Sequence, residues 1–92
     1  MGRAVIGDGS DVIDETTVRR QLAGFLRGTS AEDIDLDVDL FDQGLDSLSA
    51  MELVQQARDA GHDVGYVDLL GDSTPRGWLR LLERRAAEER GA

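Results

Sequence analysis

The sequence of 92 residues contains no cysteine, no lysine and a single histidine. Disulfides and thiolate metal sites are therefore excluded, and His62 alone cannot build an imidazole metal cluster. No apolar run is long enough for a membrane-spanning helix or a secretory signal segment. These absences predict a cytoplasmic protein without a membrane partner and without a cysteine- or histidine-based metal centre.

Aromatic residues are also few, so Leu, Val, Ile and Ala must supply most of the core. The aromatic side chains are Phe25, Phe41, Tyr66 and Trp78. A chain of this length with 40% hydrophobic residues forms one small domain. Such a domain has little room for a deep catalytic cavity.

Basic residues are few: the chain has 10 basic and 19 acidic residues, which gives a formal net charge of −9. This balance repels phosphate backbones, so nucleic acid is not an expected partner. An acidic surface of this kind favours docking onto basic surfaces of other proteins.

The first ten residues are rich in glycine and lack periodicity, which predicts a disordered lead over residues 1–10 and one domain over 11–90. A first helix is expected to begin between Asp11 and Asp14, since acidic residues suit a helix N-terminus. Gly28 is expected to end it. Its apolar face consists of Val18, Leu22, Phe25 and Leu26.

Residues 29–46 present two readings. The stretch from Asp33 to Leu40 alternates strictly between acidic and apolar residues, a pattern typical of a half-buried strand. However, no partner strand is evident, and aspartate disfavours strands. We therefore predict a long loop whose apolar residues dip into a helical core. A loop of this length in a small domain is expected to have a function.

A second helix is predicted from Ser47 to Ala60, with Gly61 as its stop. Its buried stripe consists of Ala50, Leu53, Val54 and Ala57. At roughly 100° per residue, Leu48 points away from this stripe and Met51 lies about a quarter turn from it. Two apolar side chains beside Ser47 are thus predicted to face solvent.

The rest of the chain predicts one short and one long helix. Residues 62–71 fit a strand or a short helix, and the lack of a partner strand favours a helix of one or two turns. Ser73-Thr74-Pro75 is a helix start. The apolar face that follows contains Trp78, Leu81, Leu82 and Arg85. The predicted fold is all-α, a small four-helix bundle of three main helices and one short helix, with a long loop between helices 1 and 2.

Two catalytic or metal-binding readings of the loop fail on residue identity. A nucleophile elbow around Ser47 needs glycines two residues to either side, where Leu45 and Ser49 stand. An EF-hand starting at Asp35 would need glycine in place of Leu40 and glutamate in place of Asp46. The acidic stretch is therefore interpreted as a solvated loop, and His62 as a solvated residue at a helix C-terminus.

The run Leu40-Phe41-Asp42-Gln43-Gly44-Leu45-Asp46-Ser47-Leu48, followed by Glu52-Leu53-Val54, resembles the acyl/peptidyl carrier protein family. The resemblance extends from Asp39 to Leu82. It implies a non-catalytic carrier in which a separate phosphopantetheinyl transferase attaches 4′-phosphopantetheine from coenzyme A to Ser47. The thiol of that arm would hold the cargo as a thioester. Independently of the family, a phosphodiester on Ser47 would lie at a helix N-terminus, which favours anions.

The resemblance also implies roles for neighbouring residues. Asp46 would help the transferase to recognise the site, and Leu48, Met51 and Val67 would contact partner enzymes. Residues 63–70 and 78–82 resemble most closely aryl carrier domains of nonribosomal peptide synthesis. The implied partners are an adenylating or acyl-loading enzyme and a condensation or other downstream biosynthetic enzyme.

Two alternatives stay open on the sequence. A polyketide or fatty-acid type acyl carrier shares the motif, although Arg58 offsets Glu52 where fatty-acid carriers have a strongly acidic second helix. In an unmodified helical interaction module, Ser47 would merely cap a helix beside a binding patch of Leu48 and Met51.

Overall fold

The computed structural model describes residues 13–26 and 28–91, which form four α-helices and two short 3-10 helices without a strand. The α-helices are α2 (Glu15–Ala23), α3 (Ser47–Asp59), α4 (Tyr66–Gly71) and α5 (Pro75–Gly91), and the 3-10 helices are η1 (Ala31–Asp33) and η2 (Leu40–Gln43). The predicted all-α bundle with three main helices and one short helix is confirmed. The lead predicted for residues 1–10 lies outside the described residues. Within them, no helix has the length and apolar character to cross a membrane.

Helix α2 begins where the sequence predicts but ends earlier. The Asp14 carboxylate caps it by accepting a hydrogen bond from the Thr17 N–H at 2.8 Å, and this bond holds the pKa of Asp14 below its usual value. The helix stops at Ala23, so the expected end at Gly28 is wrong. Gly24, a poor helix former, begins a turn in which the Phe25 N–H donates to the Leu22 carbonyl at 2.9 Å. Leu26 still reaches the core from this turn.

The other helix ends follow the predicted signals. Gly61 adopts a left-handed φ of 99°, its N–H donates to the Arg58 carbonyl, and the His62 N–H donates to the Ala57 carbonyl. These two bonds form the Schellman motif that terminates α3. At the start of α5, the Thr74 hydroxyl accepts a hydrogen bond from the Gly77 N–H at 3.0 Å, and proline occupies the first helical position.

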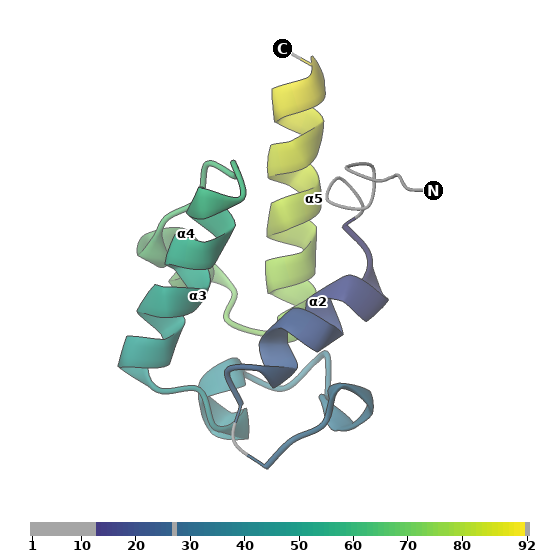
Figure 1. Ribbon diagram of the computed structural model, residues 1–92, viewed down its shortest axis with the longest axis vertical. Helices are drawn as coiled ribbons and strands as arrows, with labels where there is room; N and C mark the ends of the chain where they lie inside the picture. The colour runs from purple at the N-terminus through teal and green to yellow at the C-terminus, as the bar shows by residue number, and fades with distance from the viewer. Residues whose placement is uncertain (1–12, 27, 92) are drawn as a thin grey trace.

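The helices enclose a core centred on Trp78, which is fully buried. Its indole N–H donates to the Gln21 side-chain oxygen at 3.1 Å, and the Gln21 amide donates to Gln56 at 3.0 Å. Three helices are linked in this way. Helix α2 packs against the first part of α5, and the short α4 packs against both α3 and α5 (Figure 1). The loop between α2 and α3 covers the end of the bundle at which α3 begins (Figure 1).

Candidate functional site

The loop that leads to Ser47 is folded into the core, as the sequence predicts. Ile34, Leu36 and Leu40 are buried, whereas the aspartates between them are exposed or half-buried. Val38 departs from the alternation, because its side chain is exposed. The strand reading is wrong, since this segment contains two 3-10 turns and no ladder.

Two side chains, Gln43 and Arg19, hold the loop in place, and neither role was predictable from the sequence pattern. The Gln43 amide nitrogen donates to the carbonyls of Asp35 at 2.8 Å and Val38 at 2.7 Å, while its oxygen accepts from the Asp35 N–H at 2.9 Å. Arg19 of α2 donates to the carbonyls of Ala31 at 2.9 Å and Ile34 at 2.7 Å. Backbone polar groups of a loop need partners, and these side chains supply them.

The loop is also tied to the start of α5. The Leu40 N–H donates to the Ser73 carbonyl at 2.8 Å, and the Ser73 hydroxyl donates to the Asp39 carboxylate at 2.6 Å. The Arg76 N–H donates to the Leu36 carbonyl at 3.0 Å. The approach to Ser47 is therefore held against the bundle by bonds between segments far apart in the sequence.

An exposed ion pair between Asp37 and Arg76, at 2.7 Å, reinforces this connection. The hydrogen bond from Arg76 lowers the pKa of Asp37, and the same bond raises the pKa of Arg76. The stabilisation from Asp37 is present above its unfolded pKa and is lost as the pH falls through the lower folded pKa. Because both groups are solvated, the pair contributes little to stability.

The last turn before Ser47 reverses the chain at Gly44, whose φ of 114° is left-handed. The Leu45 N–H then donates to the Leu40 carbonyl at 3.0 Å, and the Leu45 side chain is buried. These contacts anchor the chain just ahead of Asp46 and Ser47.

Asp46, rather than Ser47, caps helix α3. Its carboxylate accepts a hydrogen bond from the Ser49 N–H at 2.7 Å, and its carbonyl accepts from the Ala50 N–H at 2.8 Å. Ser47 is the first helical residue and is exposed. Its hydroxyl makes no hydrogen bond to another residue that the structure describes. The reading of Ser47 as a cap is therefore wrong, and the hydroxyl is accessible.

The surroundings of Ser47 fit a phosphodiester. The N–H groups of Ser47 and Leu48 precede the first intrahelical hydrogen bonds, so they remain available to an anion. The dipole of α3, which has 13 residues, favours negative charge at this end. Ser47 is exposed to solvent, so no buried side chain would obstruct a 4′-phosphopantetheine group on its oxygen.

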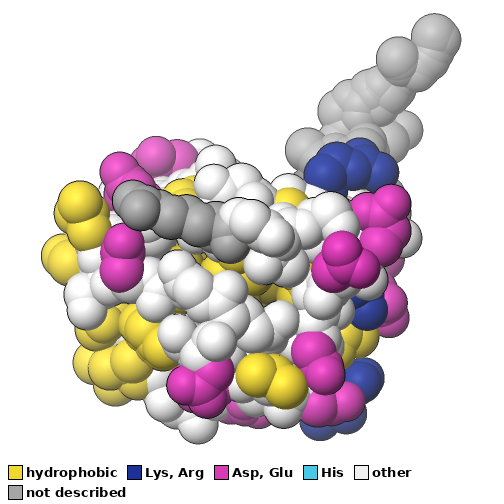
Figure 2. All heavy atoms as spheres, turned by 90° about the horizontal axis from the view of Figure 1, so that it is seen from below, with side chains coloured by type: hydrophobic (Ala, Val, Ile, Leu, Met, Phe, Trp, Pro, Cys, Tyr) yellow, Lys and Arg dark blue, Asp and Glu magenta, His cyan; other side chains and the backbone are white. Residues whose placement is uncertain are grey.

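Four apolar side chains lie exposed on α3 and α4, and we call them the apolar patch. Leu48 is 70% exposed and Met51 59%, which confirms their predicted direction, while Val67 is 80% and Leu70 49% exposed. Figure 2 shows the molecule from the end at which α3 begins. Hydrophobic side chains gather there on the same side on which α3 and α4 lie in Figure 1. Leu70 was not predicted as part of this surface, although its spacing of three residues from Val67 indicates a shared face.

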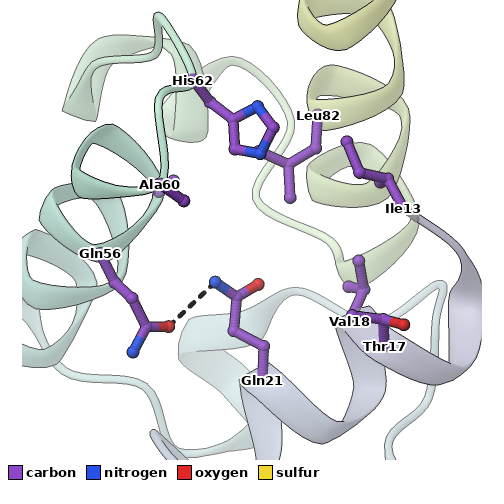
Figure 3. A pocket seen from close by; sticks show the side chains of 9 residues that line it. Ile13, Thr17, Val18, Gln21, Gln56, Ala60, His62 and Leu82 are labelled. Carbon is purple, nitrogen blue, oxygen red and sulfur yellow. Dashed lines mark hydrogen bonds between the residues drawn. The ribbon is translucent and has the colours of Figure 1, made fainter. Parts of the chain in front are cut away.

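A pocket of about 240 Å³ lies elsewhere, between α2, α3 and α5. His62, Leu82 and Ile13 line it at one end, and the hydrogen-bonded pair Gln21–Gln56 lies at the other (Figure 3). The expectation of a solvated His62 is wrong, because the side chain is half-buried in this pocket. Among the side chains that the structure describes, no group of three or more His, Asp or Glu residues is arranged to hold a metal ion.

Removing the Asp46 cap is expected to destabilise the domain. Asp46→Ala should lower the free energy of unfolding by about 1 kcal/mol, since the Ser49 N–H loses its acceptor. Asp46→Asn keeps an acceptor at the cap and should lose only a few tenths of a kcal/mol. Urea denaturation followed by circular dichroism measures both. Equal losses for the two variants would show that the charge, rather than the cap, stabilises the domain.

Comparisons with known proteins agree with the geometry at Ser47. Residues 12–82 match the protein-family model described as "Phosphopantetheine attachment site". An isochorismatase of Bacillus subtilis (strain 168) is 41% identical over 71 residues, which are 77% of this chain and 22% of that protein. Phenyloxazoline synthase MbtB of Mycobacterium sp. (strain MCS) is 37% identical over 81 residues, which are 88% of this chain and 7% of that protein. No solved structure gives a significant match. The chain thus spans less than a quarter of these relatives.

Proposed function

Because this chain belongs to the family of phosphopantetheine attachment domains, whose members carry covalent 4′-phosphopantetheine, we propose that Ser47 bears the group. The accessible Ser47 hydroxyl at the start of α3 is the observation that carries this proposal. The preceding loop is held by side chains and by α5, so the hydroxyl occupies a defined position. Domains of this family are carriers, and their chemistry is supplied by other enzymes.

The modification needs no catalytic group from this chain. A phosphopantetheinyl transferase would form a bond between the Ser47 oxygen and the phosphorus of the phosphopantetheine arm, and the nucleotide part of coenzyme A would leave. No general base among the described residues is bonded to the Ser47 hydroxyl, so activation falls to the transferase. Asp46, the neighbouring exposed carboxylate, would help the transferase to recognise the site.

The cargo would be held on the thiol of the arm as a thioester. The chain has no cysteine of its own, so the arm would supply the only thiol. The phosphodiester, in turn, would be stabilised by the first N–H groups of α3. This arrangement separates the reactive sulfur from the folded domain.

We propose that the cargo is an aryl or aminoacyl group handled in nonribosomal peptide synthesis. The name of one relative, a phenyloxazoline synthase, contains a phenyl group and favours an aromatic acid. The partners would be an adenylating or acyl-loading enzyme and a condensation or other downstream enzyme. A polyketide or fatty-acid type acyl carrier is the alternative, and loading assays with aryl, aminoacyl and malonyl substrates distinguish the three.

Incubation with coenzyme A, magnesium and a broad-specificity phosphopantetheinyl transferase tests the modification. We expect the intact mass of the wild-type protein to rise by one phosphopantetheine group, and peptide mapping to place the group on Ser47. No gain in mass would contradict the proposal and favour an unmodified interaction module. A gain on another residue would contradict the assignment of the group to Ser47.

The apolar patch is expected to contact the loading enzyme. Leu48→Asp or Met51→Asp should slow loading of the modified protein by about tenfold or more, because each places a charge in an apolar contact. The free energy of unfolding should change by less than about 0.5 kcal/mol, since both side chains are exposed. Thioester formation with radiolabelled substrate and urea denaturation measure the two effects.

Thr16→Asp is the matched control, because it adds the same charge on α2, beside η1 and away from the patch. This variant should load at the wild-type rate. If all three variants loaded slowly, the added negative charge, rather than a change in the apolar patch, would account for the slower loading. A large loss of stability in Leu48→Asp would show that this side chain supports the fold.

A further inference from the structure

A second surface lies between α4 and α5, where a groove of about 460 Å³ opens to solvent. Its lining includes Val67 and Gly71 of α4 and Gly77, Arg80, Leu81 and Arg84 of α5. Gly77 allows the connection after α4 to pass close to the first turn of α5, because a Cβ there would overlap Asp72. Gly71 leaves open space, since a Cβ there would meet no atom within 4 Å.

The two carboxylates of the groove already have partners. Asp68 accepts a hydrogen bond from the Gly65 N–H at 2.8 Å and lies 3.5 Å from the Arg85 guanidinium. Asp72 accepts from the N–H and the hydroxyl of Thr74, at 3.2 Å and 2.8 Å. Their negative charge is therefore partly satisfied within the domain.

The two arginines of the groove are differently placed. Arg80 and Arg84 are exposed, stand one turn apart on α5, and make no side-chain hydrogen bond or ion pair with the residues that the structure describes. Arg76, one turn earlier, is already paired with Asp37, and Arg80 adds only a longer-range attraction to that carboxylate. Two guanidinium groups thus remain available beside a groove whose floor includes the buried Leu81.

We propose that the groove between α4 and α5 binds an acidic segment of a partner protein. Two carboxylates one helical turn apart in that segment would pair with Arg80 and Arg84, since guanidinium groups bind carboxylates in a bidentate manner. An apolar residue beside them would pack on Val67, which joins the groove to the apolar patch. The net charge of −9 opposes binding to nucleic acids and anionic membranes. A short acidic segment is small enough to meet Arg80 and Arg84, beside carboxylates that already have partners within the domain.

A peptide titration of the unmodified, ¹⁵N-labelled chain of 92 residues tests this proposal by NMR. The probe is a synthetic amphipathic helical peptide with leucines on one face and two glutamates spaced by four residues, and the matched peptide has glutamines instead. We expect the glutamate peptide to shift the amide signals of Val67, Gly71, Gly77, Arg80 and Arg84. The shifts should saturate and should weaken as the salt concentration rises.

Two variants examine the charge and the shape of the groove separately. The double variant Arg80→Gln, Arg84→Gln should weaken binding by about fivefold to tenfold, as expected for the loss of two exposed ion pairs. Gly71→Leu keeps both charges and should block the groove, which would reduce binding by a similar factor. Arg20→Gln, an exposed change on α2, should bind like the wild type. Ser47→Ala should also bind normally, so failure of the groove and failure of the modification can be told apart.

Several outcomes would overturn the proposal. These are equal binding of the glutamine peptide, shifts centred on another surface, and undiminished binding by the double variant. If inorganic phosphate at the same concentration of charge produced the same shifts, the groove would be an adventitious anion site only. Preferential binding to phosphatidylglycerol vesicles would assign the arginines to a membrane surface instead.

Discussion

Ser47→Ala is expected to abolish the gain of phosphopantetheine mass completely, because the variant lacks the oxygen that would form the proposed phosphodiester. Loading of any cargo should disappear with it, since the arm provides the only thiol. The measurement is intact mass after incubation with coenzyme A, magnesium and the transferase, followed by the loading assay. A full gain of mass in the variant would place the attachment elsewhere.

Ser49→Ala is the matched control for this variant. Ser49 lies two positions further along α3, is half-buried, and contributes its N–H rather than its hydroxyl to the Asp46 cap. Its variant should gain the full mass. The free energy of unfolding should change by less than about 0.5 kcal/mol in Ser47→Ala, because Ser47 does not cap the helix. A loss near 1 kcal/mol is the result expected of a cap residue, and it would contradict the geometry at Asp46.

Trp78→Ala is expected to lower the free energy of unfolding by about 3–5 kcal/mol, the largest stability effect in the domain. The side chain is fully buried and its indole N–H is bonded to Gln21, so truncation leaves a cavity and an unpaired acceptor. A small domain has little stability to lose, and much of the variant should unfold at 37 °C. Thermal and urea denaturation must be followed by circular dichroism, because the only tryptophan is removed.

Trp78→Phe separates packing from hydrogen bonding in this prediction. It keeps an aromatic ring in the core but removes the donor to Gln21, so it should lose less stability than the alanine variant. Leu79→Ala, at the half-buried neighbouring position, should also lose less than Trp78→Ala. A loss below about 1 kcal/mol in Trp78→Ala would show that the core does not depend on this residue.

Much of the site was predictable because its information is local. The helical period of α3 is enough to place Leu48 and Met51 outside and the Ala50–Ala57 stripe inside. Gly61 and Pro75 mark helix ends through backbone preferences that need no distant contact. The segment from Asp33 to Leu40 was correctly predicted as a loop. Its aspartates and the absence of a partner strand argued against the strand that its alternation indicates.

Other features depend on contacts that no local pattern contains. Residue type alone allowed both Asp46 and Ser47 as the cap of α3, and only the geometry chose Asp46. The half-buried position of His62 depends on how the helices pack. The groove at Arg80 and Arg84 exists only because the fold brings α4 beside α5.

The sequence by itself thus determined the helices, the exposed apolar residues and the accessible serine with its family motif, since all of these follow from spacing and residue type. Only the tertiary structure decided how that serine is held. Gln43 fastens the loop from inside, Arg19 fastens it to α2, and Arg76 binds Asp37 across 39 positions of the chain. The bonds of Arg19 and Arg76 form only once the core brings distant segments together, and those of Gln43 form only once the loop is folded. Periodicity within one segment cannot reveal either kind.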